Sequence, residues 1–201
     1  AGKMTELAGD NPARMLGIFE VLGWYSLVVA LGLVLMVFVV YPGILLAVNR
    51  NLSYTEFFKA MSPAQFLAFS SSSSAATLPV TMECVNKNLK VKEEITGFVL
   101  PIGATVNMDG TSLYQAVAVV FLAQFHGVDL NLTQQLAIIL TATLASIGSA
   151  AVPSAGLIML IIVLESVGLN PAWIAIIFPV DRILDMCRTV VNVTGDATVS
   201  S

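Results

Sequence analysis

A long apolar run from Leu16 to Val48, with Glu20 near its start, restricts the possible folds of this chain more than any other feature. The run covers roughly thirty residues, and about 20 apolar residues suffice for a helix to cross the hydrocarbon core of a bilayer. Of the 201 residues, 11% are charged, whereas soluble domains carry about 25% charged residues. We therefore expect an all-α polytopic membrane protein, with a long or tilted transmembrane helix over residues 16–50 behind a polar segment, residues 1–15.

Two later regions contain apolar segments that are too short to cross a membrane. In residues 61–92 the serine tract Ser70–Ser74 follows such a segment, and in residues 131–168 two segments flank the small-residue tip Ala145–Gly156. Two short helices around a small tip are typical of a re-entrant hairpin, whose backbone must be buried in protein or line a wet cavity. A flexible serine linker is the alternative for the first region, but its apolar flanks and Pro79 argue against it.

Two full spans follow the hairpins, and each contains polar residues. Residues 95–125 are interrupted by the sequence Asn-Met-Asp-Gly-Thr at 107–111, and residues 171–201 contain the charged stretch Asp181–Asp196. Glycine and a buried acid at mid-membrane predict local unwinding, which frees carbonyl oxygens of the kind that hard cations prefer. We therefore expect two broken transmembrane helices. A kink satisfied by neighbouring helices is the alternative for residues 107–111.

The charged stretch also has helical spacing. Asp181, Asp185, Arg188 and Asn192 are three or four residues apart, so they share one face of a helix. Charges at membrane depth are expensive and mark ligand or ion pathways. That face is suited to a zwitterion with an additional acidic group. The alternative is a salt-bridged surface helix after the last span.

The order of the segments indicates an internal repeat. Each hairpin is followed by a polar-interrupted helix, and such pairs point to a secondary transporter with its site at the repeat interface. Lysine and arginine flank the first hairpin but are absent from Glu93 to Asp181, so the positive-inside rule places the base of that hairpin in the cytoplasm. The second hairpin then enters from the opposite side, and we expect the two tips to meet near the midplane of the plasma (inner) membrane.

These motifs together resemble the glutamate/aspartate transporter family, the dicarboxylate/amino acid:cation symporters. The resemblance is carried by Ser71–Pro79, Asn107–Thr111, Ala145–Gly148 and Asp185–Asp196. It covers nearly the whole chain and corresponds to the C-terminal part of the family: one transmembrane helix, hairpin 1, helix 7, hairpin 2 and helix 8. It implies sodium-coupled symport of acidic amino acids, contact with membrane lipid, and a homotrimer formed through scaffold helices that these residues do not contain.

The resemblance also implies site residues. Ser74, with Ser72 and Ser73, holds the α-carboxylate of the substrate, and Asp185 holds its ammonium. Thr111 and Arg188 bind the side-chain carboxylate. The implied set is completed by Val152, Gly156, Thr189 and Asn192, with Arg182 as a possible accessory residue.

For sodium, the resemblance implies two or three sites and no organic cofactor. The first site uses the carbonyls of Gly103, Asn107 and Asn192 with the carboxylate of Asp196. The second uses the backbone of Thr105, Ser146, Ile147 and Ser149 with the sulfur of Met108. A third uses Asn107 and Asp109, and its remaining ligands belong to a family helix that these residues do not contain.

The chain departs from the family pattern at three places. Ser72 and Met186 stand where family members often place an arginine, so Arg182 is the candidate replacement. Gln115 stands where proton-coupled relatives carry a glutamate, which argues against proton coupling. Two residues of the second tip, Ala151 and Ser154, replace common glycines, and we expect a stiffer gate.

Other functions fit the residues less well. A C4-dicarboxylate has no ammonium to pair with Asp185, and a neutral amino acid leaves Arg188 unpaired. An intramembrane hydrolase would need a tract serine and His126, but no Gly-x-Ser-x-Gly elbow occurs in the sequence. A purely structural bundle leaves the buried charges without a purpose. A net charge of −4 does not favour nucleic acid as a partner.

Overall fold

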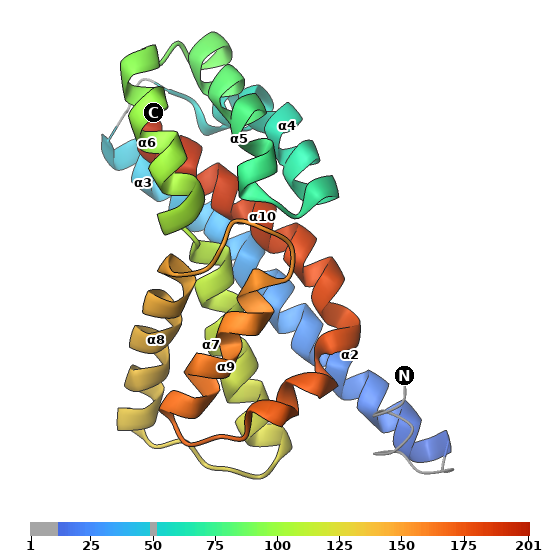
Figure 1. Ribbon diagram of the computed structural model, residues 1–201. Helices are drawn as coiled ribbons and strands as arrows, with labels where there is room; N and C mark the ends of the chain where they lie inside the picture. Colours follow the sequence, from blue (N-terminus) through green and yellow to red (C-terminus); the bar gives the residue numbers. More distant parts are fainter. Residues whose placement is uncertain (1–11, 49–51) are drawn as a thin grey trace.

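The computed structural model describes residues 12–48 and 52–201, and in this part of the chain every regular element is helical. Figure 1 shows two helical hairpins arranged about a long C-terminal helix, α10, with the N-terminal helix α2 running obliquely past it. The all-helical expectation is confirmed. The elements, in order, are α2 (Pro12–Leu35), η1 (Met36–Val40), α3 (Tyr41–Val48), α4 (Tyr54–Ser71), α5 (Ser74–Glu83), η2 (Cys84–Asn88), α6 (Glu93–Val106), α7 (Asp109–Phe125), α8 (Leu132–Ile147), α9 (Ala155–Ser166), η3 (Pro171–Ile176) and α10 (Phe178–Ser200).

The first long helix is continuous from α2 to α3 but widens to a π-helical turn at η1. Pro42 accounts for the widening, because proline has no N–H to donate to an earlier carbonyl and its ring clashes with the preceding turn. The hydroxyl of Tyr54 donates a hydrogen bond to the carbonyl of Val37, five residues before the proline. Within the described residues, Leu16–Ala47 is the one helix long and apolar enough to cross a membrane, with a mean hydropathy of 2.7.

The first hairpin consists of α4 and α5, and it begins earlier than expected. The expected hairpin starts at residue 61, whereas α4 starts at Tyr54. Residues 54–60 contain polar side chains, but Phe57, Met61 and Ala64 are fully buried on one face. This spacing of four and three residues is that of an amphipathic helix, and it overrides the polar composition.

A second pair of helices and an interrupted helix follow along the chain. Helices α8 and α9 lie side by side around a tip at residues 148–154. Helix α8 begins at a capping box, in which Asn131 and Gln134 exchange hydrogen bonds with each other's backbone. Asn107 and Met108 separate α6 from α7, and neither has helical backbone angles.

The expected break in the last helix is wrong. Helix α10 runs without interruption from Phe178 to Ser200, and only the short 3₁₀ segment η3 precedes it. A single glycine in a helix costs only about 1 kcal/mol relative to alanine, which packing offsets here. A Cβ atom on Gly195 would lie 2.7 Å from the hydroxyl of Tyr41 and 2.8 Å from the amide nitrogen of Asn107. Gly195 therefore allows close packing and does not unwind the helix.

The described residues form two hydrophobic cores, and helix α10 contributes to each. Leu184 and Val191 belong to the core that includes residues of α2, α7, α8 and α9. Val193 and Ala197, toward the C-terminus, belong to the core that includes residues of α4, α5 and α6. One hairpin thus accompanies each half of α10, and both hairpin tips point toward the middle of that helix (Figure 1).

Candidate functional site

The two hairpin tips touch each other. The hydroxyl of Ser73 in the first tip donates a 2.7 Å hydrogen bond to the carbonyl of Ala151 in the second. The backbone N–H of Ala75 approaches the same carbonyl at 3.4 Å. Each tip also contains a serine with positive φ, Ser72 at 52° and Ser154 at 63°. These angles are unfavourable for residues other than glycine, so the tips are held in shape by their contacts.

A cavity of about 20 Å³ lies between the tips and α10. It has room for about one water molecule, so an amino acid fits only if the tips separate. Eight of the ten predicted substrate residues line it. They are Ser72, Ser74, Thr111, Val152, Gly156, Asp185, Thr189 and Asn192.

The two predicted substrate residues that do not line the cavity lie beside it. Ser73 joins the tips, and Arg188 is 1% exposed behind Gly156. A Cβ atom on Gly156 would lie 2.7 Å from the Thr111 methyl group and 3.8 Å from the Arg188 guanidinium. Glycine at position 156 therefore keeps the approach to Arg188 open.

The guanidinium of Arg188 lies among two carboxylates and an aromatic ring. Nη2 is 2.6 Å from Oδ1 of Asp185, and Nη1 is 3.2 Å from Oδ1 of Asp181. Its central carbon lies 3.8 Å from the centre of the Tyr114 ring. Within the described residues, Nε and Nη1 are buried without a hydrogen-bond partner. These two nitrogens leave donors for a further carboxylate, such as that of a substrate.

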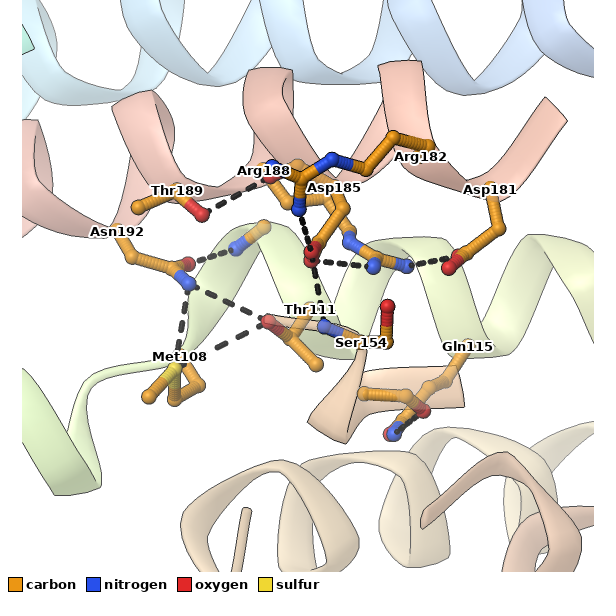
Figure 2. A network of polar contacts seen from close by, with 12 residues as sticks. Met108, Thr111, Gln115, Ser154, Asp181, Arg182, Asp185, Arg188, Thr189 and Asn192 are labelled. Atoms are coloured by element: carbon orange, nitrogen blue, oxygen red, sulfur yellow. Dashed lines mark hydrogen bonds and ion pairs between the residues drawn. The ribbon is translucent and has the colours of Figure 1, made fainter. Parts of the chain in front are cut away.

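Asp185 is the centre of the polar network in Figure 2. Besides Arg188, it accepts a 2.9 Å hydrogen bond from the backbone N–H of Ser154 in the second tip. The half-exposed Arg182 lies 3.9 Å from Oδ2 of Asp185, the same oxygen that accepts from Ser154. Asp185 thus connects α10 to the second tip, and Arg182 lies close enough to be the accessory cation.

Asn192 holds the break between α6 and α7 against α10. Its side-chain oxygen accepts from the backbone N–H of Gly110 at 2.8 Å. Its amide nitrogen donates to Met108 sulfur and to the Thr111 hydroxyl, each at 3.2 Å. This arrangement needs Gly110, because a Cβ atom there would lie 2.8 Å from the carbonyl oxygen of Arg188.

The predicted ligands of the first cation site lie together. The amide of Asn107 donates a 2.9 Å hydrogen bond to Oδ1 of Asp196, and a Cβ atom on Gly103 would lie 2.5 Å from the same oxygen. Asn192 lies one turn before Asp196 on α10. Because α10 is unbroken, the carbonyl of Asn192 already serves the helix and has one remaining lone pair for a cation.

Asp109, predicted for a further cation site, lies at the start of α7 and is reached by the first long helix. The hydroxyl of Tyr41 is 3.1 Å from Oδ2 of Asp109. It is also 3.2 Å from the backbone carbonyl of Val191 on α10. Neither Asp109 nor Asp196 has an ion pair with a basic side chain in the part of the chain that the structure describes.

The predicted ligands of the second cation site are four backbone groups and the sulfur of Met108. Met108 and Ser149 line the central cavity, and Ser146 is buried in α8. The side chains of Thr105 and Ile147 are exposed, which does not bear on their backbone carbonyls. This site stays a prediction.

Three residues near the site were not among the predicted ligands. Asp181 shares the predicted polar face of α10 and contacts Arg188, so its spacing is a signal that could have identified it. Tyr114 lies beneath Arg188 and Tyr41 reaches Asp109. Both tyrosines sit within apolar stretches, where no sequence pattern distinguishes them from core residues.

His126 lies outside the site. It follows the last residue of α7, where its ring stacks on Trp173 at a centroid distance of 3.7 Å. The serine tract approaches the opposite end of α7, through the cavity that Met108 and Ser72 share. A helix of 17 residues is about 25 Å long. His126 therefore cannot activate a serine in the tract.

Comparison with known proteins gives a consistent result. The model of the sodium:dicarboxylate symporter family matches residues 2–201. Excitatory amino acid transporter 3 from rabbit and from human are each 49% identical over 197 residues, which is 98% of this chain and 36% of each relative. Human excitatory amino acid transporter 2 is 46% identical over 176 residues, covering 88% of this chain and 30% of that protein.

The chain thus spans about a third of the length of these relatives. The match nevertheless includes both hairpins, the broken helix and the charged face of α10. On this evidence the chain belongs to the sodium:dicarboxylate symporter family.

Proposed function

We propose that this protein is a secondary active transporter that carries acidic amino acids together with sodium by alternating access. The observation that carries the proposal is the cavity between the two tips, with Asp185 on its wall and Arg188 directly behind it. A carboxylate and a guanidinium side by side match the ammonium and the side-chain carboxylate of an acidic amino acid. The names of the excitatory amino acid transporters support the same substrate class.

In this proposal the substrate lies between α10 and the two tips. Arg188 and Thr111 bind the side-chain carboxylate, and Asp185 with Thr189 and Asn192 binds the ammonium end. Ser74, with the backbone of Ser72 and Ser73, binds the α-carboxylate. Val152 and the rest of the second tip cover the substrate.

Sodium is the second transported species. Asp196 with Asn107, Gly103 and Asn192 offers carboxylate, amide and carbonyl oxygens, which suit a hard cation. Within the described residues no group of three or more His, Cys, Asp or Glu side chains converges, so a monovalent ion with few charged ligands fits this donor set. The number of sites, two or three, stays a prediction.

The helix lengths support re-entrant hairpins. Helix α9 has 12 residues and is about 18 Å long, less than the roughly 30 Å of a hydrocarbon core. Membership in a family of membrane symporters makes this a multi-pass plasma-membrane protein. We propose that the hairpins enter from opposite sides as an inverted repeat, and that the homotrimer implied by the resemblance is the assembled form.

Asp181 and Asp185 distinguish this substrate class from the alternatives within the family. Arg188 faces two carboxylates, so a dicarboxylate without an ammonium would add two negative charges to this cluster. A neutral amino acid would leave the buried guanidinium without a further anion. The family is made up of transporters, and with His126 remote from the serines we propose no hydrolytic activity.

Binding of L-aspartate and L-glutamate to the purified protein tests the proposal. We expect affinity to rise with sodium when choline replaces it at constant ionic strength, because the two ligands are linked. Succinate and L-alanine are the matched controls, since each lacks one of the two charged groups. Affinity that is independent of sodium, or equal for aspartate and succinate, would contradict the proposal.

A further inference from the structure

The hydroxyl of Tyr41 has two acceptors on opposite sides of the predicted cation site at Asp109. It lies 3.1 Å from Oδ2 of Asp109 on α7 and 3.2 Å from the carbonyl oxygen of Val191 on α10. A phenol carries a single hydrogen and can donate to one acceptor at a time. The two nearly equal distances mean that the hydroxyl can change acceptor by rotation alone.

The surroundings fix the tyrosine ring but leave the hydroxyl in a polar cluster. The side chain of Tyr41 is 2% exposed. Its hydroxyl fits only because residue 195 is glycine, since a Cβ atom on Gly195 would lie 2.7 Å from the Tyr41 hydroxyl oxygen. Asn107 approaches the same glycine and donates to Asp196. The part-buried Asp109 and the buried Asp196 therefore each receive one side-chain hydrogen-bond donor.

The local backbone geometry directs the Tyr41 side chain toward Asp109 and Gly195. Tyr41 directly follows the π-helical turn Met36–Val40, and its backbone N–H donates to the carbonyl of Met36. A π-helical turn inserts an additional residue into the helix and rotates the side chains that follow, and such turns are frequent at functional sites. Pro42 and the Tyr54 contact to Val37 hold this turn in place.

We infer that Tyr41 is a positioning residue that substitutes for the cation at Asp109, an inference that rests on the proposed sodium coupling. When no cation is bound, its hydroxyl donates to the Asp109 carboxylate. When a cation binds that carboxylate, the hydroxyl donates to the Val191 carbonyl. Tyr41 thereby stabilises the unloaded carboxylate selectively and sets the sodium concentration that the transporter needs.

The substitution Tyr41→Phe removes the hydroxyl and keeps the ring. We expect the sodium concentration for half-maximal aspartate binding to fall by about three- to tenfold, because hydrogen bonds to charged groups are among the stronger ones. Aspartate affinity at saturating sodium should stay within about twofold of wild type. Tyr54→Phe is the control for loosening of the π-helical turn alone, because it removes a tyrosine hydroxyl that bonds the Val37 carbonyl and does not contact Asp109.

Thermal unfolding provides a readout that does not depend on transport or substrate. In sodium-free choline buffer, Tyr41→Phe should unfold at a lower temperature than wild type, and in saturating sodium the difference should become smaller, leaving only the loss of the bond to Val191. A purely structural role would lower both temperatures equally. If Tyr41→Phe leaves the sodium requirement unchanged, the inference is wrong. If the variant needs more sodium, the inference is also wrong, and Tyr41 is instead a ligand of the cation. If aspartate binding to the wild type does not depend on sodium, the proposed sodium coupling itself is wrong, a result distinct from the first two.

Discussion

Nη2 of Arg188 lies 2.6 Å from Oδ1 of Asp185, one turn earlier on α10. The two groups that the proposed substrate needs are therefore paired with each other across the cavity wall. An acidic amino acid that enters can take both partners at once, its carboxylate binding Arg188 and its ammonium binding Asp185. The charge in this buried region stays balanced throughout the exchange, which lowers the free-energy cost of moving charges between partners in a low dielectric.

The first prediction concerns Arg188. Arg188→Cys should lower aspartate affinity by more than about a hundredfold, because removing one partner of a buried ion pair costs about 3–5 kcal/mol. Asp181 and Asp185 lose their shared cation in this variant, so unfolding should be measured as well. Arg188→Lys keeps the charge but loses the fork and should give an intermediate affinity. Retention of wild-type aspartate affinity in the cysteine variant would show that Arg188 does not bind the substrate carboxylate.

The second prediction concerns the ammonium. Asp185→Asn keeps an oxygen that can accept from the N–H of Ser154 but removes the negative charge opposite the ammonium. Aspartate binding should weaken by several kcal/mol, whereas succinate, which has no ammonium, should bind as well as to wild type or better. Competition binding measures both. An equal loss for the two ligands would contradict the assignment of Asp185.

The third prediction concerns Gln115, whose amide nitrogen donates a 2.9 Å hydrogen bond to the Gly156 carbonyl at the start of α9. This amide keeps its proton at every pH, so it contributes no pH dependence. In Gln115→Glu only the protonated acid can donate to that carbonyl, and the ionised carboxylate repels it. Aspartate affinity of the variant should therefore fall several-fold as the pH rises, while the wild type changes little. A pH-independent variant would contradict this role.

Much of the architecture follows from local sequence patterns. Glycine, proline and polar residues act locally on the backbone, and the chain leaves helical geometry at 107–108 and at the tip 148–154. Gly195 shows where this reasoning fails. From sequence it resembles Gly110 near the break at 107–108, yet α10 passes through it, because Tyr41 and Asn107 occupy the space beside it. Close packing between distant segments decides such cases.

In the candidate site too, local spacing can be read from the sequence, whereas contacts between distant segments cannot. The helical spacing of Asp181, Asp185, Arg188 and Asn192 predicts their shared face, and all four are buried together. Spacing does not reveal that Asp185 also reaches the N–H of Ser154, 31 residues earlier. This contact depends on how hairpin 2 folds back onto α10, which is a tertiary event without a signal in either segment alone.

The fourth prediction concerns the contact between the tips. Ser73→Ala removes the hydrogen bond to Ala151 and also the cap at the start of α5, where the Ser73 hydroxyl accepts from the N–H of Ala76. The tips should separate more readily, and dissociation of bound aspartate should accelerate several-fold in stopped-flow measurements. Ser73→Thr retains the hydroxyl and should behave like wild type. Ser70→Ala removes an exposed hydroxyl that bonds within its own turn, so an equal acceleration there would contradict the assignment.

The last prediction separates cation binding from substrate binding. Asp196 accepts from Asn107, and among the described residues no basic side chain pairs with it. Asp196→Asn should raise the sodium concentration for half-maximal aspartate binding by about tenfold or more, equivalent to about 1.4 kcal/mol, because the neutral amide retains an oxygen but loses the charge.

At saturating sodium the aspartate affinity of Asp196→Asn should change much less, since Asp196 does not line the cavity. Linkage requires that sodium and aspartate tighten each other's binding by the same factor, so the full titration of one against the other should show the mutation acting on sodium alone. A variant that loses aspartate affinity equally at all sodium concentrations would show that Asp196 supports the substrate pocket instead.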